Sequence, residues 1–326
     1  MACPKYFDAH NHIQNYLGQR EADEGSVELM LTNGTAPDDW QKVLALAAAD
    51  KRVLPCFGLH PWFINKAGPL WLEELEIFLR RAPSCVGEIG LDGAKNADTV
   101  RQQEVFTAQL KLAAKLGLPA CLHCVKAWRV MLKIIKEELP GTFMLHSYGG
   151  PAEMIKEFSA LGAYFSFGAA ITRILQNEKM QDSPQQRGAD SALCAPNPQG
   201  CIRREATPEH CEGNSSTEEF RIMDPKRGKL RKALLTVPPE RLLFETEPPS
   251  FAPALLPGAS KRRGPDAPAL SLRPQSLPAL ISAAAAVMGR PAEELAELSW
   301  ANGIKFLGDI AAVRNSALVW KTDSHV

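Results

Sequence analysis

Short apolar segments typical of strands alternate with amphipathic segments typical of helices along most of this 326-residue chain. This alternation favours parallel strands, because a helical crossover returns the chain to the same edge of the sheet before each new strand. Eight such units favour an α/β fold of the closed (β/α)8 TIM-barrel type over an open sheet. The expected strands are residues 5–12, 26–32, 52–58, 84–91, 119–124, 142–146, 163–167 and 241–246.

We expect one barrel domain over residues 1–313, followed by a tail over 314–326. Residues 181–225 interrupt the pattern with many polar residues and few large apolar ones, so they bury too little surface to offset the entropy of ordering. We predict a disordered insertion there and a Pro-rich loop over 248–274. The expected helices are 38–50, 70–81, 99–116, 128–138, 151–161 and 229–236, with closing helices at 276–288, 292–300 and 302–313.

Composition and charge exclude some classes of protein. Hydrophobic residues make up 45% of the chain, enough for a sizeable core, and the formal net charge is zero, so any affinity for phosphate must be local. No apolar run approaches the roughly 18 residues that span a bilayer, and Met1 precedes the first strand too closely for a signal peptide. We therefore expect a cytoplasmic protein without membrane contact, in which most of the eight cysteines are buried thiols. The sequence does not determine the oligomeric state, and a monomer is favoured.

Histidine and glutamate side chains lie in or just after six of the expected strands. The carboxyl ends of barrel strands converge on one face, so these side chains should meet there. His10 and His12 are two residues apart, and side chains with this spacing on a strand share a face, which suits chelation of one metal ion. The full set is His10, His12, His60, Glu88, His123, His146 and Glu247.

Glu88 is a charged residue inside an apolar strand, which is costly unless the carboxylate is paired or coordinated. A carboxylate between two ions can give one oxygen to each. His123 and His146 end consecutive strands; each alone would more often be an ordinary core histidine, but together they favour a metal site. His60 precedes Pro61 in a turn, and we predict that it contacts substrate phosphate rather than metal.

Six motifs follow one another as in the TatD family of metal-dependent deoxyribonucleases, which the chain resembles. The resemblance covers nearly all of the chain outside the two interrupting stretches, and it includes the closing segment SWANGIKFLG. GEIGLD and the FDxHxH start are specific when they occur together. The motifs are FDAHNH, GLHPW, GEIGLD, PACLHC, LHSYGG and RLLFETEPP.

The resemblance implies the roles of the site residues. His10 and His12 would hold one divalent ion, His123 and His146 a second, and Glu88 would bridge the two. The implied ions are Mg, Mn or Zn. The implied reaction is hydrolysis of phosphodiester bonds by metal-activated water, with DNA or a small phosphodiester as substrate.

Three positions depart from the family pattern. Glu247 stands where the family has a catalytic and metal-binding Asp, which keeps the charge but lengthens the side chain by one methylene. Val125 stands where an Arg is usual, and the neighbouring Lys126 replaces that bidentate phosphate contact only in part. Trp62 stands where a second His is frequent.

These departures leave two other functions open. One is a barrel that keeps metal and ligand binding with weakened or lost catalysis. The other is a hydrolase of small esters, lactones or amides, which the neutral charge favours mildly over long DNA. Cys121 and Cys124 have the spacing of half a thiolate zinc site, but no second pair matches them, so we expect packing residues.

Overall fold

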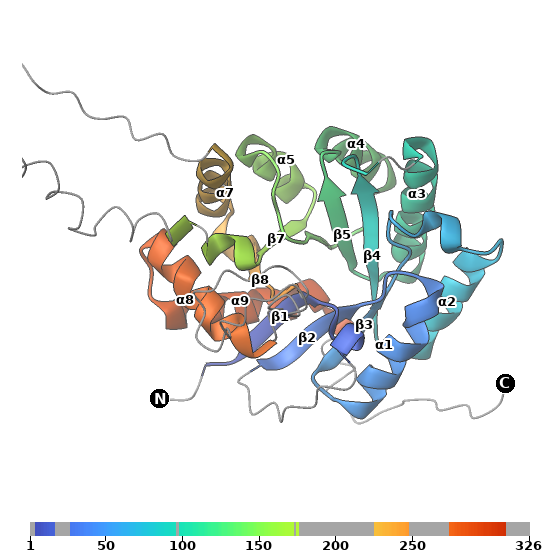
Figure 1. The fold of residues 1–326 in the computed structure, drawn as a ribbon, viewed down its shortest axis with the longest axis horizontal. Coiled ribbons are helices and arrows are strands. Elements are labelled where there is room, and N and C mark those ends of the chain that lie inside the picture. The colour runs from blue at the N-terminus through green and yellow to red at the C-terminus, as the bar shows by residue number, and fades with distance from the viewer. Residues whose placement is uncertain are drawn as a thin grey trace, which may run out of the picture.

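Eight parallel strands form one sheet in sequence order in the computed structural model, which describes residues 4–16, 27–95, 98–172, 174–175, 225–247 and 274–310. The sheet curls into a nearly closed barrel, as expected from the sequence (Figure 1). The strands are β1 (Tyr6–Asn11), β2 (Val27–Asn33), β3 (Val53–Phe57), β4 (Cys85–Asp92), β5 (Ala120–Val125), β6 (Phe143–Leu145), β7 (Ala163–Phe167) and β8 (Leu242–Phe244).

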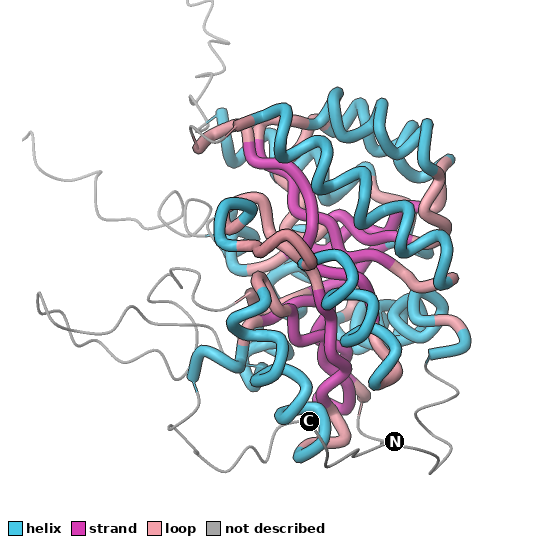
Figure 2. Tube along the Cα trace, turned by 90° about the vertical axis from the view of Figure 1, so that its right-hand side faces the viewer, coloured by secondary structure: helices cyan, strands magenta, loops and turns pink. Residues whose placement is uncertain are grey.

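Helices surround the strands on the outside, as Figure 2 shows with the strands at the centre and the helices around them. Local signals set their ends. In α3, for example, the Asp98 side chain accepts hydrogen bonds from two backbone amides of the first turn, and Gly117 ends the helix in a left-handed conformation. The helices are α1 (Pro37–Ala49), α2 (Trp71–Arg81), α3 (Thr99–Leu116), α4 (Trp128–Glu138), α5 (Ile155–Ala160), α7 (Pro225–Thr236), α8 (Leu277–Met288) and α9 (Ala292–Leu307).

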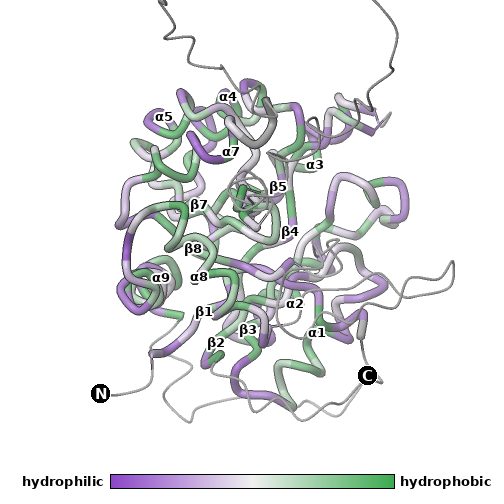
Figure 3. The backbone as a smooth tube through the Cα atoms, turned by 60° about the vertical axis from the view of Figure 1, so that its left-hand side comes forward, coloured by the Kyte–Doolittle hydropathy of each residue, from purple (hydrophilic) through white to green (hydrophobic). Residues whose placement is uncertain are grey.

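The strands bury side chains on both faces, which is why they are continuous apolar runs. The outward face packs against the helices and forms the larger core cluster. The inward face fills the barrel with a second cluster that includes Phe7, Leu31, Cys121 and Met144. Figure 3 shows the strands as largely hydrophobic, whereas the helices alternate between hydrophobic and hydrophilic residues.

A buried aspartate joins the first and last strands. Asp8 accepts hydrogen bonds from the backbone N of Thr246 at 2.9 Å and from its Oγ1 at 2.6 Å. One step further along, the backbone N of Glu247 donates to the carbonyl of His10 at 3.0 Å. The end of β1, which carries two candidate ligands, is thereby fixed against the segment that follows β8.

The predicted division of the last helices is wrong. We expected one helix to end at Trp300 and another to start at Asn302, but α9 runs unbroken through this point. Asn302 is held inside the helix because its amide donates to the carbonyls of Pro239 and Leu242, at 2.7 and 2.9 Å. Gly303 faces the Phe7 ring so closely that an added Cβ would lie 2.3 Å from it, so glycine permits this packing.

Several sequence predictions lie outside the described residues. These are the disordered insertion except for Pro225, the Pro-rich loop except for Pro274, and the tail. The prediction of buried thiols is confirmed for four cysteines, which are Cys56, Cys85, Cys121 and Cys124. Among the residues the structure describes, no helix has both the length and the apolar character to cross a membrane.

Candidate metal centre

Glu88 is the centre of a cluster of five histidines at the carboxyl end of the barrel. It belongs to β4 and is 3% exposed. Gly90, two residues further along, allows the strand to come close to β5, since it has φ 148° and an added Cβ would lie 2.0 Å from the carbonyl oxygen of His123. Glu88 thus projects its carboxylate among imidazoles from several strands.

Two of the imidazoles face one carboxylate oxygen. His12 Nε2 lies 3.1 Å and His10 Nε2 lies 3.5 Å from Oε2 of Glu88. The two imidazole nitrogens are themselves 3.1 Å apart. His10 and His12 therefore lie on one face of the strand, as predicted. Their Nε2 atoms lie close together beside the carboxylate of Glu88.

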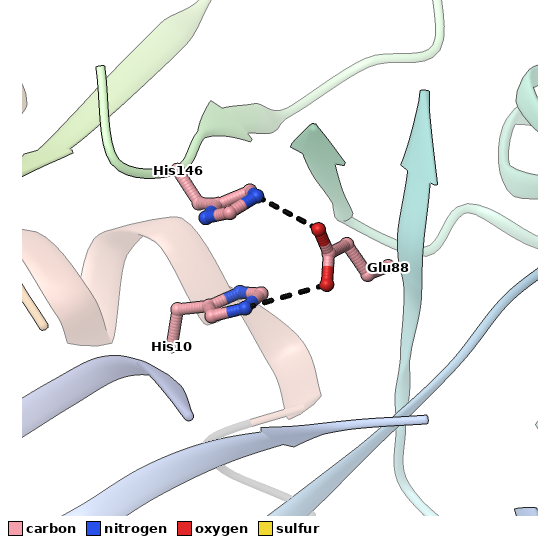
Figure 4. Close-up of side chains that lie close together, drawn as sticks. All are labelled: His10, Glu88 and His146. Carbon is pink, nitrogen blue, oxygen red and sulfur yellow. Dashed lines mark ion pairs between the residues drawn. The ribbon is translucent and has the colours of Figure 1, made fainter. Parts of the chain in front are cut away.

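The other three imidazoles face Oε1 of Glu88. His123 Nδ1 and His146 Nε2 both lie 2.9 Å from this oxygen and 3.1 Å from each other. His60 Nε2 lies 3.1 Å from the same oxygen. Figure 4 shows His10 and His146 on the same side of Glu88, each facing a different oxygen, and their rings stack 4.0 Å apart.

A hydrogen-bonding group lies behind each of the two imidazoles at the end of β1. His12 Nδ1 is 2.7 Å from the backbone carbonyl oxygen of Asn33, which can only accept, so Nδ1 carries the proton. His10 Nδ1 is 3.1 Å from Sγ of Cys121, a thiol that can accept from this nitrogen or donate to it. A neutral ring with its proton on Nδ1 directs the lone pair of Nε2 toward Glu88, as a metal ligand must.

The imidazoles from β5 and the end of β6 have carboxylates behind them. His123 Nε2 lies 3.5 Å from Oδ2 of Asp92. His146 Nδ1 lies 3.7 Å from Oε1 of Glu245 and 4.0 Å from Oε1 of Glu247. Each carboxylate favours the proton on the far nitrogen, which leaves the lone pair of the near nitrogen facing Glu88. This arrangement of carboxylate, histidine and site centre is typical of metal-binding histidines.

His60 has the opposite arrangement. The backbone N–H of Trp62 donates to its Nδ1 at 3.1 Å, so this nitrogen is the acceptor. Burial lowers the pKa of His60, which keeps the ring neutral. The single ring proton must then be on Nε2, pointing at Glu88. His60 therefore presents a hydrogen-bond donor to the site, although it is as close to the carboxylate as the other rings.

The charges in the cluster depend strongly on one another. Burial by itself would raise the pKa of Glu88, but His60 and His146 beside it hold that pKa well below its ordinary value. Burial opposes charge on His146, yet Glu88 and Glu245 raise its pKa well above the ordinary value. Burial lowers the pKa of His10 well below the ordinary value. The carboxylate of Glu88 is therefore ionised, and a proton on His146 would have to leave before this ring could bind a cation.

The donor set fits divalent cations. With protons on the far nitrogens, the lone pairs of His10 and His12 face each other at 3.1 Å, and those of His123 and His146 do the same. A divalent cation between the two rings of each pair would accept both lone pairs. Imidazoles with a carboxylate suit Zn or Mn, and the described residues offer three-residue sets of this kind around Glu88.

The carboxylates after β8 form a separate part of the site. Glu245 is fully buried, accepts a hydrogen bond from Oγ of Ser166, and burial raises its pKa to about 7. The Glu247 side chain is 28% exposed, and its backbone has φ 38°, a conformation that costs a non-glycine residue about 1 kcal/mol or more. With His146 these two carboxylates make another possible metal-binding group. The Glu247 carboxylate thus lies beside His146, on the side of that ring away from Glu88.

Lys126 is exposed at the end of β5 and lies outside the imidazole cluster. Val125, which precedes it, ends β5 and is partly buried. Trp62 is 47% exposed and lies beside the cluster, with its ring centroid 5.0 Å from that of His60 and 6.1 Å from that of His123.

Sequence reasoning missed the residues behind the rings. Asp92 and Glu245 carry a usable signal, since each is an acidic residue at or just after the end of an apolar strand. Cys121 carries none, because a buried thiol in a strand is explained by packing alone. Asn33 acts through its backbone carbonyl, which residue type does not reveal.

Comparison with protein families gives a match over residues 7–193 to the family described as TatD related DNase. The "Uncharacterized metal-dependent hydrolase YjjV" of Escherichia coli (strain K12) is 30% identical over 184 residues, which are 53% of this chain and 71% of that protein. The "3'-5' ssDNA/RNA exonuclease TatD" of Klebsiella pneumoniae (strain 342) is 27% identical over 311 residues, 91% of this chain and 95% of that protein.

Solved structures show the same fold. The crystal structure of YjjV, a TatD homologue from Escherichia coli K12, has a TM-score of 0.66 at 22% identity and covers 93% of this chain and 98% of that chain. The crystal structure of a TatD-family hydrolase from Entamoeba histolytica has a TM-score of 0.64 at 14% identity and covers 94% and 99%. At these identities the structural likeness concerns the barrel alone.

Proposed function

The chain belongs to the TatD related DNase family of metal-dependent hydrolases, and we propose that it hydrolyses phosphodiester bonds of single-stranded nucleic acid with two metal ions. The observation that carries the proposal is the Glu88 carboxylate, whose two oxygens face separate groups of imidazoles. The name of the Klebsiella pneumoniae relative, an exonuclease of single-stranded DNA and RNA, supports the substrate class.

The proposed ligands are the two pairs of imidazoles that face the two oxygens of Glu88. His10 and His12 would hold one ion with Oε2 of Glu88. His123 and His146 would hold the other with Oε1. Ions bound in this way lower the pKa of water and stabilise negative charge on phosphoryl oxygens.

Two further residues are suited to act on the reacting groups. Glu247 is partly exposed and carries a carboxylate, so we assign it the acceptance of a proton from the attacking water at Oε1. It also remains a proposed ligand, through its place beside His146. Neutral His60 can donate its Nε2 proton to a phosphoryl oxygen, in keeping with the predicted contact to substrate. Lys126 is proposed to contact phosphate at the rim.

The proposal is tested by incubating purified protein with Mn, Mg or Zn and single-stranded DNA or an aryl phosphodiester. We expect turnover that disappears in Glu88→Ala, since this change removes the group shared by both ions. If no metal gives turnover above that of Glu88→Ala, the nuclease function is wrong. Aryl carboxylic esters and lactones tested in parallel would reveal the small-ester hydrolase, and bound metal without any turnover would reveal the binding protein.

A further inference from the structure

The indole of Trp62 is a large aromatic surface held rigidly at the mouth of the barrel. Its Nε1 donates to Oδ2 of Asp92 at 2.5 Å, while 47% of the residue stays exposed. Asp92 is itself buried and also lies behind His123. The indole is therefore fixed one ring away from the metal centre and open to solvent.

Positive charge accompanies the indole on the neighbouring loops. The ammonium of Lys95 lies 3.2 Å from the centre of the Trp62 ring. The backbone N of Gly93 donates to the carbonyl of Val125 at 2.7 Å, so the turn that carries Lys95 lies against the end of β5, where Lys126 is exposed. Trp62, Lys95 and Lys126 thus follow the three consecutive strands β3, β4 and β5. Two positive charges therefore lie at this edge of a chain whose net charge is zero.

We propose that Trp62 stacks on the nucleobase next to the scissile bond and that Lys95 binds a phosphate of the same strand. Single-stranded nucleic acid is commonly bound by aromatic side chains for the bases and cations for the backbone. A small ester or lactone would need neither. The assignment deepens the proposed function, since it names a base-bearing single strand as the ligand, but stacking does not depend on the chemical step.

A second lysine–tryptophan pair provides a matched control. Lys5 precedes β1, and its ammonium lies 5.5 Å from the centre of the Trp300 ring. Trp300 belongs to α9 and packs against the barrel interior at the end opposite to the mouth. A lysine over an indole is thus compatible with a purely structural role, and the position of Trp62 beside His60 and His123 is what distinguishes it.

The test measures binding by fluorescence anisotropy with two labelled probes in Mn. One is a short oligothymidylate with phosphorothioate linkages, which resist hydrolysis, and the other is the same backbone without bases. We expect the wild type to bind the first probe about tenfold tighter or more, as one stacked base provides. In Trp62→Ala the ratio of the two affinities should fall to about one, whereas Trp62→Phe should keep most of it and Trp300→Ala should leave it unchanged.

The ratio compares the affinities of one protein for two probes. A variant that is partly unfolded binds both probes less, so its ratio does not change for that reason. A ratio of one in the wild type, or an unchanged ratio in Trp62→Ala, would overturn the stacking role. Lys95→Gln should reduce the slope of log affinity against log salt by about 0.7, the value for one phosphate contact of a single strand. An unchanged slope would remove Lys95 from the subsite.

The proposed hydrolysis and the proposed subsite can fail separately. Hydrolysis with an unchanged affinity ratio in Trp62→Ala would leave the nuclease function standing and overturn the stacking role. Loss of the ratio in Trp62→Ala, together with no turnover by the wild type in any metal, would support the subsite and contradict the nuclease function.

Discussion

The end of β5 and the turn after β3 each bring a histidine to the same oxygen of Glu88, but the two rings are prepared for different tasks. His123 lies 2.9 Å and His60 lies 3.1 Å from Oε1. Behind His123 is the carboxylate of Asp92, an acceptor, and behind His60 is the backbone N–H of Trp62, a donor. The first ring therefore offers a lone pair to the centre and the second offers a proton.

Proximity to the carboxylate thus does not assign a role to a histidine in this site. The atom on the far side of the ring decides which nitrogen carries the proton. The comparison gives His60 a donor function although its distance alone would group it with the ligands. The same reasoning applies to His12, whose Nδ1 faces the carbonyl of Asn33, so that its Nε2 offers a lone pair.

Replacing the two histidines should separate these roles and give the largest effect. We expect His123→Ala to lose one ion and about a thousandfold or more in kcat/KM, since a Lewis acid stabilises charge by several kcal/mol and each 1.4 kcal/mol is about tenfold. His60→Ala should keep both ions and lose about a hundredfold. Metal analysis and kinetics on the same preparations check this, and loss of an ion from His60→Ala would contradict the tautomer assignment.

Changing Glu247 tests whether this glutamate, which stands where the family has an aspartate, accepts a proton during the reaction. Glu247→Gln preserves size and removes the proton acceptor, so we expect kcat to fall by about 100-fold or more with both ions retained. Glu245→Gln is the matched change two residues earlier, behind His146, and should weaken metal binding instead. Unchanged turnover in Glu247→Gln would exclude it from the reaction.

Removing the Cys121 thiol behind His10 should have a smaller effect on metal binding. Cys121→Ala removes the hydrogen-bond partner of Nδ1, and loss of such a partner typically weakens metal binding by about 10- to 100-fold. We expect the low end of this range, because sulfur is a weak acceptor. Cys124→Ala is the control on the opposite face of β5, and titration with a competing chelator should find its metal affinity close to that of the wild type.

The smallest loss of activity is expected when the ring N–H of His60 is replaced by the N–H of another side chain. The amide of Gln can present an N–H near the place of Nε2, so His60→Gln should recover most of the activity that His60→Ala loses. Equal activity in the two variants would mean that His60 acts by filling space.

The sequence predicts the barrel and the cluster well because both depend on local patterns. Apolar runs reveal the strands, and a polar residue such as Glu88 inside or at the end of such a run points to the mouth. The comparisons confirm the family that the motifs indicate. The role of each residue stays a prediction for the experiments above.

Features that depend on packing could not be predicted. The tautomer of His60 depends on the turn that directs the N–H of Trp62, and the closure of the barrel depends on Asp8 meeting Thr246 across 238 residues of sequence. The Asn302-Gly303 pair looks like a break in a helix, but contacts with Leu242 and Phe7 hold the helix together.

The most direct test of the account is the number of metal ions per chain, measured by elemental analysis after loading and removal of free metal. We expect two ions for the wild type, since each oxygen of Glu88 faces its own pair of proposed ligand imidazoles. We expect at most one for Glu88→Gln, because a neutral amide cannot bridge two cations. One ion in the wild type, or two retained by Glu88→Gln, would contradict the central role of Glu88.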